Sequence, residues 1–126
     1  MPITFHPRAG CVLVCNFQGF IEPEIVKTRP VVIVSPKWLQ RHRLYTVVPL
    51  STTEPNPIEK FHCRLQKDPT PNSNAVVWAK CDMLYTVSMD RLDRFKVGRG
   101  AYKTSAVSDD ELVAIMACIK YALGIE

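Results

Sequence analysis

All ten prolines of this 126-residue chain lie between positions 2 and 71, and they divide that part of the sequence into short segments. Proline lacks a backbone N–H and breaks helices, so long helices are excluded from this part of the chain. The apolar runs between and after the prolines are rich in Val, Leu and Ile, which favours strands. We therefore predict short strands at residues 10–17, 31–34, 44–50, 61–66, 75–80 and 83–87, with loops at 51–60 and 67–74.

The hydrophobic period changes near the end of the chain. Ser108 and Glu111 have the spacing of a capping box, which begins a helix, and Gly124 favours a helix end. Between them an apolar stripe recurs at steps of three and four, formed by Leu112, Ile115, Met116, Ile119 and Leu123. The predicted fold is mainly β with one helix, a small antiparallel barrel closed by a C-terminal helix in a single domain of residues 1–126.

Composition limits the class of protein. Hydrophobic residues make up 47% of the chain and its net charge is +4, which excludes a disordered protein and permits an anionic partner. No apolar run approaches the roughly 20 residues that span a bilayer, and the N-terminus does not resemble a secretory signal. Five cysteines without a CxxC pair are typical of reduced thiols, so we expect a cytoplasmic protein without membrane partners.

No metal or cofactor is expected. The three histidines are far apart in the sequence, no two potential ligands have structural-zinc spacing, and there is no glycine-rich phosphate loop. A Cys–His nucleophile pair stays open, because such residues meet in space rather than in sequence. Cys11, Cys15 and Cys118, however, occur in apolar patterns that are typical of buried thiols.

The segment that ends in Arg29 is a candidate for phosphate binding. Pro30 biases the preceding residue, Arg29, toward an extended conformation. Because proline suits the first position of a strand, we expect a strand to begin at Pro30 and Arg29 to lie at the junction between the loop and this strand. The permanently charged guanidinium presents a fork of donors that suits phosphate oxygens. Lys27 and Glu24 lie on the loop before it. The alternative is that Arg29 pairs with Glu24 and only holds the loop in place.

Two further groups of polar residues follow predicted strands. Ser51, Thr52 and Thr53 come after the strand at 44–50, where hydroxyls either donate hydrogen bonds to phosphate or form a turn for local reasons. Lys80 and Asp82 lie on one face of an extended segment. They either serve a site or form a local ion pair.

Cations also gather in two stretches that contain aromatic residues. Residues 1–50 have a net charge of +4, and residues 91–103 carry five basic residues against one acidic residue. Trp38 lies near Arg41 in the first stretch, and Phe95 and Tyr102 lie in the second. Cations and aromatic rings together suit single-stranded RNA, because cations follow the backbone and rings stack on bases. The alternatives are a solvated surface and rings that cover the barrel.

Together these segments resemble the MazF/PemK (Kid) toxins of type II toxin–antitoxin systems, from residue 10 to about residue 92. The resemblance depends on the order and spacing of several motifs, none of which is specific alone. They are the strand opened by Gly10, Glu24 five residues before Arg29-Pro30, the run Val31-Val32-Ile33-Val34-Ser35-Pro36, the run Val48-Pro49-Leu50-Ser51-Thr52, and Lys80-Cys81-Asp82, which looks like the family's Arg-Cys-Asp.

The resemblance implies an SH3-like barrel, a homodimer, that cleaves single-stranded RNA without a metal. The RNA 2′-hydroxyl attacks the adjacent phosphate and leaves a 2′,3′-cyclic phosphate and a 5′-hydroxyl, which spares DNA. A cognate antitoxin protein neutralises such toxins. The basic surface of this chain would suit an acidic antitoxin segment.

The resemblance also implies roles for individual residues. Arg29 matches the catalytic arginine of the family, and Ser51 matches a position that is usually Thr. Glu24 matches an acidic residue before the arginine, and Asp82 matches the aspartate proposed as a base in some members. The RNA-binding residues expected beside this catalytic set are Lys27, Thr52, Thr53, Lys80, Trp38 and Arg41.

The sequence departs from the family in its first loop and at Lys80. Pro23 stands where several members have His, and Ile25 and Val26 replace a Gln-Gly character, which affects loop chemistry and sequence preference. Lys80 keeps a positive charge but lacks the bidentate fork of arginine. Two other functions stay open. One is a CcdB-like gyrase poison, which would not use Arg29, and the other is an inactive RNA-binding barrel.

Overall fold

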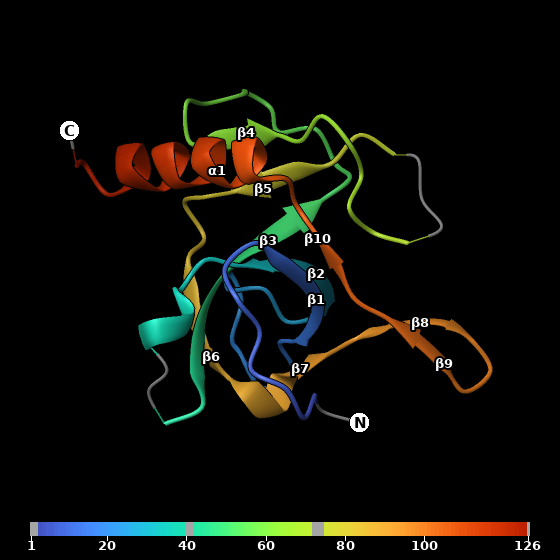
Figure 1. The fold of residues 1–126 in the computed structure, drawn as a ribbon. Helices are drawn as coiled ribbons and strands as arrows, with labels where there is room; N and C mark the ends of the chain where they lie inside the picture. Colours follow the sequence, from blue (N-terminus) through green and yellow to red (C-terminus); the bar gives the residue numbers. More distant parts are fainter. Residues whose placement is uncertain (1–2, 40–41, 72–74, 126) are drawn as a thin grey trace.

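The computed structural model of the chain describes residues 3–39, 42–71 and 75–125. Within these ranges short strands are joined by loops and a helix ends the chain, so the fold is mainly antiparallel sheet with one C-terminal helix, as predicted (Figure 1). The elements are β1 (Cys11–Asn16), β2 (Thr28–Ile33), β3 (Leu44–Ser51), β4 (His62–Arg64), β5 (Trp78–Lys80), β6 (Tyr85–Ser88), β7 (Leu92–Asp93), β8 (Phe95–Gly98), β9 (Ala101–Lys103), β10 (Ser105–Ala106), α1 (Asp109–Ala122) and the 3-10 turns η1 (Lys37–Leu39) and η2 (Met89–Arg91).

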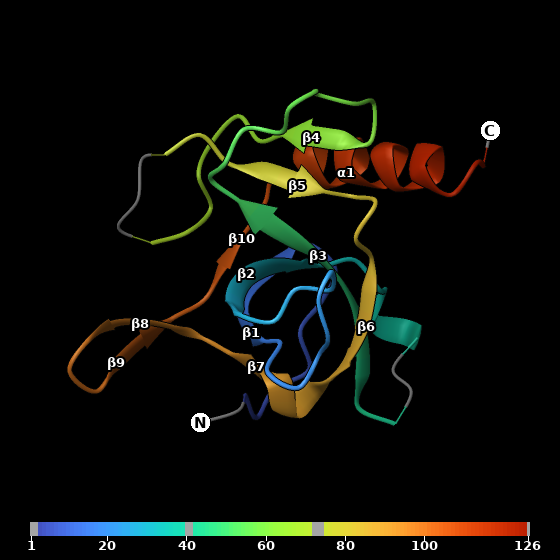
Figure 2. The ribbon, with the colours of Figure 1, turned by 180° about the vertical axis from the view of Figure 1, so that it is seen from behind.

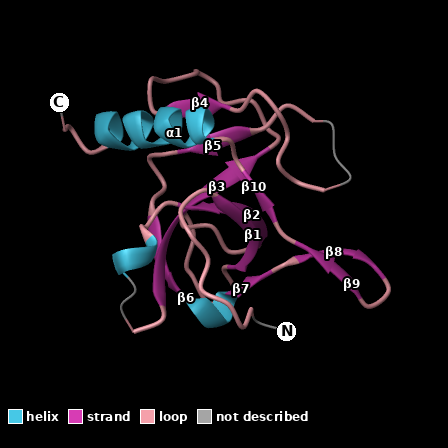
Figure 3. Cartoon of the chain, viewed as in Figure 1, coloured by secondary structure: helices cyan, strands magenta, loops and turns pink. Residues whose placement is uncertain are grey.

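The centre of the sheet is formed by β1, β2 and β3, which pair antiparallel. The first half of β3 pairs with β6, and its end pairs with β5, which in turn pairs with β4. On the opposite edge of β1 lie β7 and β10. The sheet is strongly curved, with β4, β5 and α1 at one end of the molecule and β6 and β7 at the other (Figures 1 and 3).

Two buried clusters lie on opposite faces of the central strands. Successive side chains of a strand point to opposite faces, so Val12 enters one cluster and its neighbour Leu13 enters the other. The first cluster includes Ile115 and Ile119 of α1, and the second contains Phe17. Burial on both faces confirms the prediction for the strand at residues 10–17.

The helix begins and ends where the sequence predicts. The Ser108 Oγ accepts the N–H of Glu111 at 3.1 Å, and a Glu111 carboxylate oxygen accepts the N–H of Ser108 at 2.9 Å, which completes the capping box. Beyond the last turn, Gly124 has a φ of +73°, a conformation that favours glycine.

The buried stripe of α1 is narrower than predicted. Ile115 and Ile119 are buried, whereas Met116 is 38% exposed and Leu123 is 59% exposed. At 3.6 residues per turn, Met116 lies about 100° around the helix from Ile115, outside the face that packs on the sheet. In the part of the chain that the structure describes, no helix has the length and apolarity to cross a membrane.

Several strands have bounds that differ from the predicted ones. The second strand begins at Thr28 rather than at residue 31, because Thr28 and the residues after it already pair with β1. Pro30 is therefore inside β2 and not its first residue, which corrects the sequence prediction. The strands β4, β5 and β6 are shorter than predicted, since a strand extends only as far as its partner.

A hairpin of β8 and β9, which the sequence pattern did not reveal to us, projects from the body of the molecule (Figures 1 and 2). Among the described strands, β8 and β9 pair only with each other. Its turn, at residues 99–100, contains Gly100, which has a φ of +69°. Because almost all of its side chains are exposed, the hairpin lacks the apolar alternation that predicts a half-buried strand.

Candidate active site

The candidate site lies where β2 and β3 separate. Their last paired residues are Val31 and Pro49. Beyond this pair β3 turns to β5, with Leu50 opposite Ala79. Pro30, the next residue of β2, has no N–H to donate to β3, so the ladder between the two strands ends where a donor is missing. The separation leaves Arg29 and Ser51 on the two sides of an opening.

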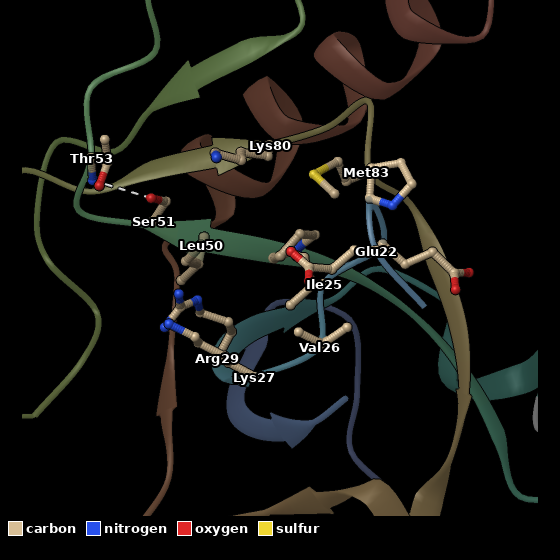
Figure 4. A pocket seen from close by; sticks show the side chains of 13 residues that line it. Glu22, Ile25, Val26, Lys27, Arg29, Leu50, Ser51, Thr53, Lys80 and Met83 are labelled. Carbon is tan, nitrogen blue, oxygen red and sulfur yellow. Dashed lines mark hydrogen bonds between the residues drawn. The ribbon is translucent and has the colours of Figure 1, made fainter. Parts of the chain in front are cut away.

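A first pocket of about 470 Å³ occupies this opening. Its walls are the loop before β2, the end of β3, and the segment that runs from β5 toward β6 (Figure 4). The lining residues are Glu22, Pro23, Glu24, Ile25, Val26, Lys27, Arg29, Pro49, Leu50, Ser51, Thr53, Lys80 and Met83. Tertiary structure thus brings together Glu24, Lys27, Arg29, Ser51, Thr53 and Lys80, which are spread over 57 positions of the chain.

The Arg29 side chain is exposed and is not committed to another protein group. Among the described residues its guanidinium forms no hydrogen bond or ion pair, so the alternative pairing with Glu24 is not formed. One carboxylate oxygen of Glu24 instead accepts the N–H of Ile21 at 2.8 Å, which orients the carboxylate within its own loop. Arg29 therefore offers an uncompensated positive charge to an anionic ligand.

The Ser51 hydroxyl is held in place and still has a proton to donate. Its Oγ accepts the N–H of Thr53 at 3.1 Å, so the hydroxyl proton is left for a ligand (Figure 4). The ammonium of Lys80 points toward this end of β3, and Arg29 reaches it from β2 (Figure 4). Lys80 and Asp82 form no ion pair, although both belong to the described residues. The end of β3 thus has a neutral donor beside two cations, Arg29 and Lys80, and Lys27 is the third cation of the pocket.

Two other predicted site residues lie elsewhere, and a third falls outside the described residues. Asp82 is exposed and does not line the pocket. Trp38, on η1, is 83% exposed, so it covers little of the barrel, and it does not line the pocket either. Arg41 lies outside the described residues.

A second pocket, of about 370 Å³, adjoins the first at Arg29, Leu50, Ser51 and Thr53. Its remaining lining residues are Pro30, Thr52, Thr70, Pro71, Val77 and Phe95. Phe95 begins the hairpin and was not among the predicted site residues. Its position beside the cations of residues 91–103 was the sequence signal that pointed to it.

A family model described as PemK-like, MazF-like toxin of type II toxin–antitoxin system matches residues 8–123. The chain belongs to this toxin family. The family named from the sequence motifs is thereby confirmed. The toxin is also 31% identical over 122 residues to YifN of Escherichia coli strain K12, with 79% of this chain and 80% of YifN covered.

Solved structures of other proteins have the same fold. MazF from Deinococcus radiodurans matches with a TM-score of 0.72 at 17% identity, over 96% of this chain and 99% of that one. An endoribonuclease from mycobacterial species, solved in complex with its cognate antitoxin, matches with a TM-score of 0.68 at 20% identity, over 95% and 97% of the two chains. These likenesses establish a MazF-like fold for the toxin.

Four of the five thiols of the toxin are unsuited to nucleophilic attack at neutral pH. Burial raises the pKa of Cys15 and of Cys63 to about 12, and it also raises the pKa of Cys11 and Cys81. Thiols with such pKa values stay protonated near pH 7, and no cysteine lines either pocket. Within residues 3–39, 42–71 and 75–125, no three His, Cys, Asp or Glu side chains form a group that would hold a metal ion.

Proposed function

We propose that this toxin is a metal-independent endoribonuclease that cleaves single-stranded RNA. The observation that carries the proposal is the free Arg29 guanidinium, which lies across the strand separation from the Ser51 hydroxyl and shares a pocket with Lys80. Two cations and a neutral donor around one opening suit a phosphate that gains charge as it reacts. The mycobacterial protein with the same fold is an endoribonuclease, which agrees with this chemistry.

In the proposed reaction the nucleophile belongs to the RNA. The 2′-hydroxyl attacks the adjacent phosphorus while Glu24 takes the hydroxyl proton. The proton goes to the carboxylate oxygen that does not accept the hydrogen bond from the Ile21 N–H. Arg29 and Lys80 stabilise the charge on the phosphoryl oxygens, and Ser51 donates a hydrogen bond to one of them. The products are a 2′,3′-cyclic phosphate and a 5′-hydroxyl. The departing oxygen takes a proton from water, and the hydroxide that remains takes the proton from Glu24, which restores the carboxylate. DNA has no 2′-hydroxyl and is spared.

Of the two predicted carboxylates, we assign the base to Glu24. Glu24 lines the pocket, whereas Asp82 lies outside its lining. Lys27, Thr53 and Lys80 line the pocket and Thr52 lines its neighbour, which supports the proposal that they bind RNA. For Trp38 and Arg41 the same role stays a prediction.

The proposed consequence is growth inhibition. Cleavage of mRNA in the cytoplasm would stop translation until a cognate antitoxin occupies the toxin, and we propose that the toxin acts there as a homodimer. The antitoxin bound to the mycobacterial relative supports such a partner.

The test is incubation of purified toxin with a long single-stranded RNA in the presence of EDTA, followed by mapping of the product ends. We expect discrete cuts with cyclic-phosphate ends for the wild type, and none for Arg29→Ala. Arg64→Ala is the matched control, because Arg64 is also exposed but lies on β4, outside both pockets.

Wild-type protein that leaves several long RNAs intact would contradict the proposal. RNA binding without cleavage would then favour the inactive barrel. Inhibition of gyrase that survives Arg29→Ala would favour the gyrase poison.

A further inference from the structure

The second pocket has a lining that suits part of a nucleotide. Its volume of about 370 Å³ lies within the usual range of small-ligand pockets. Ser51, Thr52, Thr53 and Thr70 contribute hydroxyls and Arg29 contributes a cation, while no carboxylate is among the lining residues. Hydroxyls bind phosphate and ribose oxygens. The Thr70 hydroxyl already donates to a carboxylate oxygen of Asp68 at 2.6 Å, so the hydroxyl donors that this pocket offers to a ligand are those of Ser51, Thr52 and Thr53.

Phe95 supplies an aromatic wall to this pocket. It is half-buried, packs against the first core cluster, and also lines the second pocket. Packing on the core holds the ring in place. Bases of single-stranded RNA stack on such rings whatever their identity.

Lys103 lies on the same face of the hairpin as Phe95. The two residues are directly opposite each other in the β8–β9 register, whereas the next pair, Lys96 and Tyr102, projects from the other face. Lys103 is exposed and, among the described residues, has no hydrogen-bond or ion-pair partner for its ammonium. Residues 94–107 contain no acidic residue that would neutralise it.

Strand β1 connects the base of the hairpin to Arg29 and fixes the position of one relative to the other. Cys15 of β1 pairs with Arg29 on one side and with Leu92 of β7 on the other. Because β10 also pairs with β1, both ends of the hairpin are attached to the same strand. The sheet therefore places the Phe95 face at a set position beside the proposed reacting phosphate.

We propose that the second pocket binds the nucleotide next to the scissile phosphate, with its base stacked on Phe95 and its outer phosphate bound by Lys103. This assignment rests on the proposed ribonuclease function and adds to it a binding subsite for the neighbouring nucleotide. It explains a preference for single strands, because a base stacked on Phe95 is removed from any duplex.

The test compares four variants on one synthetic single-stranded RNA that contains the mapped cleavage site. Phe95→Leu keeps an apolar side chain for the core but removes the stacking face, and we expect it to raise KM about tenfold with little change in kcat. Phe95→Tyr keeps the ring and is expected to retain the wild-type KM. Equal thermal unfolding midpoints establish that the variants are folded.

The two lysines of the hairpin form the matched pair of the test. Lys103→Gln is expected to raise KM and to reduce the slope of log KM against log salt by about 0.7, the loss of one phosphate contact. Lys96→Gln removes the same charge from the opposite face and is expected to leave both quantities unchanged. Equal effects of the two changes would mean that the hairpin attracts RNA only through its overall positive charge, and would overturn the proposal.

Binding of a fluorescent mixed-sequence single-stranded RNA, measured in parallel, separates this proposal from the proposed reaction. If the wild type cleaves RNA but Phe95→Leu and Lys103→Gln keep its KM, the subsite is overturned while the proposed reaction stands. The face of the hairpin would then be assigned to binding of an acidic protein partner. If the wild type binds RNA through Phe95 without cleaving it, the reaction fails and the subsite stands. If it neither binds nor cleaves, both proposals are overturned.

Discussion

The two pockets of this toxin share one edge and differ in the charges around it. Both contain Arg29 and Ser51, which lie on the two sides of the separation between β2 and β3. The first pocket adds Glu22 and Glu24, whereas the second adds hydroxyls, Phe95 and no carboxylate. Proton transfer needs a basic group, but carboxylates repel the RNA backbone. The comparison teaches that one break in a sheet provides a side suited to reaction and a side suited to binding.

Removing the group common to both pockets is expected to have the largest effect. Arg29→Ala should lower kcat/KM for RNA cleavage by about 10³-fold or more, because a cation that stabilises the reacting phosphate is lost. The measurement is cleavage of the mapped RNA at substrate concentrations below KM, with Arg64→Ala as control. Retention of a tenth of the wild-type rate would contradict the shared role of Arg29.

Changing the first pocket alone is expected to lower kcat and to spare binding. Glu24→Gln keeps an oxygen that accepts the N–H of Ile21 but cannot take a proton, so kcat should fall about 10²-fold while RNA affinity stays unchanged. Glu22→Gln is the control in the same pocket, because the Glu22 carboxylate points away from Arg29 and Ser51 (Figure 4). If both changes lowered kcat equally, the assignment of Glu24 rather than Glu22 as the base would be contradicted.

The neutral donor at the shared edge is expected to contribute less than the cation. Ser51→Ala should lower kcat/KM about tenfold, the scale of one neutral hydrogen bond. Ser51→Thr keeps the hydroxyl and should retain most of the activity, as steady-state cleavage rates would show. A Ser51→Thr variant as slow as Ser51→Ala would indicate that side-chain shape, and not the donor, matters at this position.

The smallest effect is expected outside both pockets. Asp82→Asn should change kcat by less than about twofold, since Asp82 lines neither pocket and a charge outside the site acts weakly through water. The same cleavage assay measures it beside Glu24→Gln. A loss for Asp82→Asn as large as that for Glu24→Gln would transfer the base to Asp82 and weaken the contrast between the pockets.

Local patterns in the sequence determined the elements and the chemistry available to them. The capping box of Ser108 and Glu111 predicted the start of the helix because its hydrogen bonds join residues only three apart. Apolar residues on both faces of the segment predicted that β1 is buried on both sides, since successive side chains of a strand point to opposite faces. Arg29 and Ser51 were identified by residue type and motif order, and the structure places both at one opening.

Tertiary structure alone decided how far each strand extends and which polar groups meet. Strand pairing with β1 put Pro30 inside β2, and the pairing of β3 with β5 aimed Lys80 at the opening while Asp82, two residues on, stayed outside it. The hairpin that places Phe95 in the second pocket has too little buried apolar surface to leave a pattern. These features depend on pairings between residues far apart in the chain, whereas sequence periodicity reports only the faces of single elements.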